Sequence, residues 1–187
     1  DFAVTKKSNQ SVYVSSAVDA NTLVTANLLA IGMAGVSAFV GYGSTGLNLT
    51  GVDLAIALWS EVGGAGRQWT SVMGSIGSAA FVGVAGLALS VSKMTLEINK
   101  SAADGTLVDY VAGAGETSVS ALVVTVGPGQ TVTFALDDAD GEYLQVAGTA
   151  EMDLFGFVTV SGDFAVTKKS NQSVYVSSAV DANTLVT

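Results

Sequence analysis

The residues best suited to chemistry are the acidic side chains of residues 137–142, which read Asp-Asp-Ala-Asp-Gly-Glu. Closely spaced carboxylate oxygens are the ligands that Ca²⁺ takes in proteins. Asp138, Asp140 and Glu142 are therefore the candidate ligands of an irregular calcium site. The competing interpretation is a solvated hairpin loop that uses Asp-Gly for its turn, and we favour that interpretation.

Other common site patterns are missing from the sequence. An EF-hand loop needs ligands at its first and twelfth positions, which here would be Leu136 and Ala147. The chain has no histidine and no cysteine, which excludes the commonest general base, thiolate zinc sites, cysteine nucleophiles and disulfides. It also lacks a Gly-x-Ser-x-Gly nucleophile elbow. We therefore predict a protein that is not an enzyme and that uses no cofactor, with calcium as the one exception left open.

Two further sets of side chains suggest surface chemistry. Tyr42, Trp59, Trp69 and Tyr110 are candidates for a sugar-binding face, although a stacked structural ladder explains them better. Three sites fit the Asn-x-Ser/Thr acceptor pattern for glycosylation, and these are Asn9, Asn48 and Asn99, with Asn171 repeating the first. If the source glycosylates exported proteins, these asparagines predict surface attachments.

The elements that position these residues belong to a repeated unit. Residues 163–187 repeat residues 1–25 without a change. Packing constraints alone would let exposed positions such as Lys6, Asn9 and Gln10 differ between the copies. We therefore predict that residues 1–162 form one tandem period, that residues 163–187 begin the next, and that neighbouring periods pack on one another. An alternative is a strand exchanged between separate subunits.

A weaker repeat divides the period into four degenerate modules of about 40 residues. Residues 37–41, Ser-Ala-Phe-Val-Gly, return as Ala-Ala-Phe-Val-Gly at residues 79–83. Residues 53–58 and 93–98 alternate between large apolar and smaller or polar side chains, which is typical of half-buried strands. The preceding alternation is out of phase in both modules, so we expect a bulge or corner at the same place in each.

The rest of the pattern also favours strands. Residues 131–136 and 143–147 flank the acidic loop and predict a hairpin. Residues 20–37 and 71–80 are the only candidates for helices, and their Gly, Ser and β-branched residues argue against long ones. We predict an all-β fold, a β-solenoid or β-roll of stacked repeats, with a chain of strand-exchanging β-sandwich domains as the alternative.

Composition narrows the class of protein. Hydrophobic residues make up 49% of the chain and charged residues 12%, which excludes intrinsic disorder. The net charge of −9 and the scattered cations oppose binding to nucleic acid. Residues 20–52 and 69–92 carry no charge and are long enough to span a bilayer, but glycines interrupt both stretches. We therefore expect no membrane span.

The segments FVGVAGLALSVSKMTLEIN and GFVTVSGDFAVTKK resemble repeats of giant bacterial surface proteins, the adhesin-like chains with long tandem arrays of β-rich repeats. The resemblance covers most of the period. It implies an extracellular or cell-surface location and a role in adhesion or in a surface coat. The calcium-binding glycine-rich nonapeptide that is frequent in this family is absent. We predict a structural repeat of an extracellular fibre, stalk or filament, or alternatively an adhesin repeat that binds carbohydrate or a partner cell.

Overall fold

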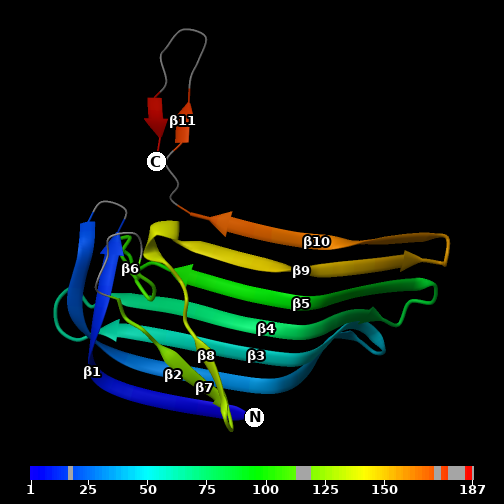
Figure 1. Cartoon of the computed structure of the whole chain (residues 1–187), viewed down its shortest axis with the longest axis horizontal. Coiled ribbons are helices and arrows are strands. Elements are labelled where there is room, and N and C mark those ends of the chain that lie inside the picture. The colour runs from blue at the N-terminus through cyan, green and yellow to red at the C-terminus, as the bar shows by residue number, and fades with distance from the viewer. Residues whose placement is uncertain (17–18, 113–118, 171–173, 177–183, 187) are drawn as a thin grey trace.

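The computed structural model describes residues 1–16, 19–112, 119–170, 174–176 and 184–186 (Figure 1). Its main body is one sheet of eight strands in the order β10-β9-β5-β4-β3-β2-β1-β6, and all neighbours are antiparallel. The strands are β1 (Phe2–Ser16), β2 (Asp19–Tyr42), β3 (Thr45–Glu61), β4 (Gln68–Val82), β5 (Leu87–Lys100), β6 (Leu107–Val108), β9 (Tyr143–Leu154) and β10 (Val158–Lys169). The prediction of an all-β chain is confirmed.

Two short hairpins accompany the main sheet. The first joins β7 (Val123–Gly127) to β8 (Gln130–Thr133) and lies across one face of β1 and β2 (Figure 1). The second joins β11 (Val174–Val176) to β12 (Thr184–Val186) in the repeated C-terminal segment. The predicted hairpin between residues 131–136 and 143–147 is wrong, because β8 pairs with β7 while β9 pairs with β5 and β10. Between β8 and β9 the acidic segment forms a 3₁₀ turn, η1 (Asp138–Asp140).

The core lies where the β7–β8 hairpin and the residues on either side of it, 119–122 and 134–136, cover the sheet. Val124, Val126 and Phe134 point from this cover onto the sheet and are at most 4% exposed. On β3 the buried face carries Ala55, Ala57 and, at its end, Trp59, and small residues occupy the part of this face beneath the hairpin. The large residues that alternate with them remain only partly buried on the opposite face. The strand was therefore predicted correctly, but its small side chains face the core because the cover approaches closely there.

The predicted irregularities of the strands are present. Gly51 in β3 and Lys93 in β5 both have positive φ, at 63° and 52°, and the ladders shift register beside them. A positive φ turns the backbone and changes which face of the sheet the following side chains occupy. This explains why the apolar alternation before each bulge is out of phase with the alternation after it. The two helix candidates, residues 20–37 and 71–80, are parts of β2 and β4. Among the described residues no helix is long and apolar enough to cross a membrane.

The repeated segment forms both long edges of the sheet (Figure 1). Its first copy contains all of β1 and the start of β2, and its second copy completes β10. Within the part of the chain that the structure describes, β6 pairs with β1 only at Val14 and Ser15, and no strand pairs with the outer edge of the first half of β1. β10 bonds to β9 along one side and has no strand on its other side among the described residues. Identical sequences therefore end the sheet on opposite sides.

Candidate functional site

The three predicted calcium ligands lie close in sequence but have different partners. Asp138 accepts a hydrogen bond from the Ser15 hydroxyl. The Asp140 carboxylate lies 3.3 Å from Lys169 Nζ. Glu142 accepts hydrogen bonds from the amide and hydroxyl of Ser101, and these lower the pKa of its carboxyl group. All three carboxylates are therefore engaged in separate contacts.

The structure brings together a different acidic group, formed by Asp109, Asp137 and Asp138. Carboxylate oxygens of these three residues lie within 4.8 Å of one another. Oxygen donors of this kind suit a hard cation such as Ca²⁺. Carboxylate oxygens of this group already accept hydrogen bonds. Asn21 Nδ2 donates to Asp109 at 3.0 Å, and the backbone amide of Ala139 donates to Asp137 at 2.9 Å. Calcium binding, by this group or by the predicted one, stays a prediction.

Asp109 is the acidic residue that the sequence did not reveal. Its side chain is fully buried, and it follows Leu107 and Val108 in a run that resembles an ordinary strand. The partners that accommodate the carboxylate are Asn21, which is distant in sequence, and the amide of Val111, 3.1 Å away. No local pattern marks such a residue, because its environment exists only after the chain has folded.

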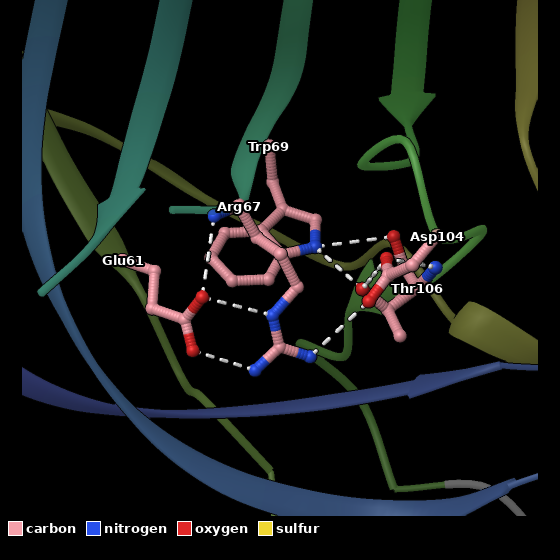
Figure 2. Close-up of polar contacts among 5 residues, drawn as sticks. All are labelled: Glu61, Arg67, Trp69, Asp104 and Thr106. Atoms are coloured by element: carbon pink, nitrogen blue, oxygen red, sulfur yellow. Dashed lines mark hydrogen bonds and ion pairs between the residues drawn. The ribbon is translucent and has the colours of Figure 1, made fainter. Parts of the chain in front are cut away.

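A second polar cluster joins two loops at the end of the sheet where β3 ends and β4 begins (Figure 2). The guanidinium of Arg67 forms a bidentate ion pair with the Glu61 carboxylate, with nitrogen–oxygen distances of 2.8 and 3.1 Å. Its third nitrogen lies 3.5 Å from the Asp104 carboxylate. The guanidinium sits 5.3 Å from the ring centre of Trp69, whose Nε1 donates to Thr106. The contacts of this cluster connect the β3–β4 loop with the loop that follows β5. Planar bidentate contacts of this kind are the strongest ion pairs.

This ion pair makes stability depend on pH. Hydrogen bonds from Arg67 lower the pKa of Glu61 from 4.5 to about 2. As the pH falls below about 4.5, the unfolded chain takes up a proton at Glu61 before the folded chain does, so stability falls. We expect Glu61→Gln to reduce the dependence of unfolding free energy on pH between about 5 and 2, measured by urea unfolding at several pH values.

The control is Glu151→Gln, which removes an exposed carboxylate from β9. This substitution should leave the dependence of the unfolding free energy on pH, between about 5 and 2, close to that of the unaltered chain. Equal slopes for Glu61→Gln and the unaltered chain would contradict the role given to the Arg67 contact.

The candidate sugar-binding aromatics are separated by the fold. Trp59, Trp69 and Tyr110 are buried in the core, whereas Tyr42 is 94% exposed at the β2–β3 turn. Trp59 Nε1 donates to the Tyr110 hydroxyl at 2.9 Å, which in turn donates to Ser71 Oγ at 2.9 Å. Burial raises the pKa of Tyr110 well above its ordinary value. Trp59 and Tyr110 are therefore joined in a hydrogen-bonded network of the core, and Trp69 is paired with Trp59 on the next strand.

A hollow of about 400 Å³ is a candidate ligand site on β1–β4. Its lining includes the cross-strand neighbours Lys6, Leu29 and Leu58, together with Leu28, Trp59 and Trp69 of the core cluster. Gln68 and Thr70 contribute polar groups to its lining. An apolar floor with a few polar groups is the usual composition of small-molecule sites.

Comparison with known proteins does not assign the chain to a family. No family model, curated protein or solved structure matches it.

The predicted glycosylation sites differ in access. Asn9 and Asn48 are exposed. Asn99 is fully buried, accepts a hydrogen bond from Ser71 Oγ and donates to the carbonyl of Val108. Attachment of a glycan to Asn99 would require this part of the sheet to open, so Asn9 and Asn48 are the sites accessible in the folded chain. Asn171 lies outside the described residues.

Proposed function

We propose that this chain is a non-enzymatic structural repeat of an extracellular fibre, stalk or surface filament. One observation carries the proposal, namely that the first residues of an identical 25-residue segment lie in the strand at each long edge of a single sheet, as residues 2–7 of β1 and residues 163–169 of β10. An unpaired strand edge recruits other strands unless it is covered. A repeat with the same strand at each edge is suited to assembly in a row, and its acidic, cysteine-free composition suits the cell surface.

The β-solenoid or β-roll of stacked repeats and its alternative, a chain of strand-exchanging β-sandwich domains, stay predictions. The direct test of the proposed function is the intact mass of the denatured protein from its source. We expect a mass of many periods, as a covalent tandem array requires. A mass near one period with a short extension would contradict the array and would leave exchange of strands between separate subunits.

The second candidate is an adhesin repeat, which the hollow over Leu29 and Leu58 supports. Its test is binding of the 187-residue chain to a panel of bacterial and host glycans, with Lys6→Ala as the variant. Lys7→Ala is the matched control, because Lys7 follows Lys6 in β1 but does not line the hollow. Binding that is lost with Lys6→Ala and kept with Lys7→Ala would favour the adhesin role, and no binding to any glycan would count against it.

A further inference from the structure

The two copies of the segment Phe-Ala-Val-Thr-Lys-Lys pair with different strands. In the first copy, residues 2–7 pair with residues 28–33 of β2. In the second copy, residues 164–169 pair with residues 143–148 of β9. Because the two sequences are identical, one strand of this sequence is compatible with either neighbour.

The two pairings use opposite edges of the strand. Along an antiparallel strand, successive residues direct their N–H and C=O groups to alternate sides. Asp1 and Ala34 exchange both backbone hydrogen bonds, at 2.8 and 3.1 Å, so the odd-numbered residues of the first copy bond to β2. The amide of Ser170 donates to Glu142 at 3.2 Å, so the even-numbered residues of the second copy bond to β9. Since residue 170 corresponds to residue 8, the groups that bond to β9 are those that point away from β2 in the first copy.

The two copies of the segment also run in the same direction and present the same side chains to the same face of the sheet. Each step across the sheet from β1 to β10 reverses the strand, and the number of steps is even, so β1 and β10 run the same way. Lys7 lies opposite Leu28, and its equivalent Lys169 lies opposite Tyr143. Leu28 and Tyr143 belong to the same buried cluster. The two copies therefore present the same residues to the same face of the sheet.

The second copy also begins a new hairpin in the original register. In the first copy, Val12 pairs with Val24 and Val14 pairs with Thr22. In the second copy, β11 and β12 pair Val174 with Val186 and Val176 with Thr184, which are the equivalent residues. The second copy is thus bonded to β9 through its first half and forms the next β1–β2 pairing through its second half.

We propose that the repeated segment is a strand shared between two periods, with β9 of one period on one edge and β2 of the next period on the other. The occupant of the free edge of β10 is the segment equivalent to residues 28–34 in a further copy of this repeat. This inference rests on the proposed structural function and specifies how the periods join.

Sharing the strand would make one continuous sheet with six strands per period, which advances about 29 Å per period at the usual strand spacing. The row of cross-strand neighbours that begins at Thr5 ends at Lys169, the equivalent of Lys7, so each period is staggered by two residues. The members of this row are Thr5, Ala30, Ala57, Ser71, Asn99, Tyr143 and Lys169. An even stagger keeps the same side chains on the same face in every period.

Residue-resolved hydrogen exchange tests the shared strand. The 187-residue chain is compared with a chain extended after Thr187 by a second copy of residues 26–187. In the shorter chain we expect slow exchange at Phe164, Val166 and Lys168 and fast exchange at Ala165 and Thr167. In the longer chain all five amides should be slow, with Ala165 and Thr167 slowed about 100-fold.

Two outcomes would overturn the proposal. If Ala165 and Thr167 exchange equally fast in both chains, the sheet does not continue across the boundary. If Val166 loses its protection in the longer chain, the segment has left β9 for the new β2. In either case the periods still form a covalent row, so the proposed function would fall only if the intact mass from the source contradicted an array.

A pair of proline variants gives an independent readout. Thr167→Pro removes an N–H that faces the free edge, so in the shorter chain protection of Val166 and Lys168 should persist. In the longer chain the same change should abolish the added protection of Ala165. Val166→Pro is the matched control, since it removes an N–H bonded to β9 and should unprotect β10 in both chains. If Thr167→Pro left the protection of Ala165 in the longer chain unchanged, this result would contradict the shared strand.

Discussion

Replacing Gly32 with alanine is expected to destabilise the chain by about 3 kcal/mol, near the upper end of the usual range for an overpacked core. Gly32 lies on β2 beneath the β7–β8 hairpin. A Cβ atom there would lie 2.1 Å from the Thr125 carbonyl oxygen and 2.7 Å from Val126 Cα. Both are backbone atoms, so a side-chain rotation cannot relieve the clash and the hairpin must move outward. The measurement is urea unfolding followed by circular dichroism.

The matched control is Gly162→Ala in the same sheet. No atom lies within 4 Å of the position that a Cβ would take at Gly162. Its unfolding free energy should change by less than about 0.5 kcal/mol, as for most surface substitutions. If Gly32→Ala behaved like Gly162→Ala, the close approach of the hairpin to β2 would be wrong.

Gly32 also explains why the sequence predicted strands better than it predicted their burial. Alternation along residues 53–58 marks a strand correctly, whichever face is covered. The rule that large apolar side chains face the core assigns Ile56 inward, but the covering hairpin approaches too closely for it. The core face of this region is instead made by Gly32, Ala55 and Ala57. A sequence pattern cannot show this, because the spacing between two layers depends on segments distant in the chain.

Pairing between strands was predictable only where it is local or repeated. The bulges at Gly51 and Lys93 followed from a change of phase that recurs in two modules. The predicted hairpin across residues 137–142 failed because β9 finds longer partners on both sides, in β5 and β10. Burial of Asp109 was hidden for the same reason, since its partner Asn21 lies far away in sequence.

The other large effect is expected from Trp69→Ala. Trp69 is 1% exposed, and it lies beside Trp59 on the neighbouring strand. Its ring lies beneath the Arg67 guanidinium, and its Nε1 donates to both oxygens of Thr106 at 3.1 Å. Truncation would leave a cavity beneath the loops that this cluster joins. We expect a loss of about 3–5 kcal/mol in unfolding free energy, measured by urea unfolding.

Two controls separate the contributions of the ring and the N–H group. Trp69→Phe keeps most of the apolar surface but leaves Thr106 without its donor, so we expect a loss of about 1–2 kcal/mol. Phe157→Ala removes a ring that is 91% exposed and should change stability by less than about 0.5 kcal/mol. A ranking in which Trp69→Ala costs no more than Trp69→Phe would mean that packing of the ring contributes little. Because a domain of this size is stable by only about 5–15 kcal/mol, the expected loss from Trp69→Ala is a large share of the total. The loops that Arg67 and Trp69 hold together would then open before the long strands separate.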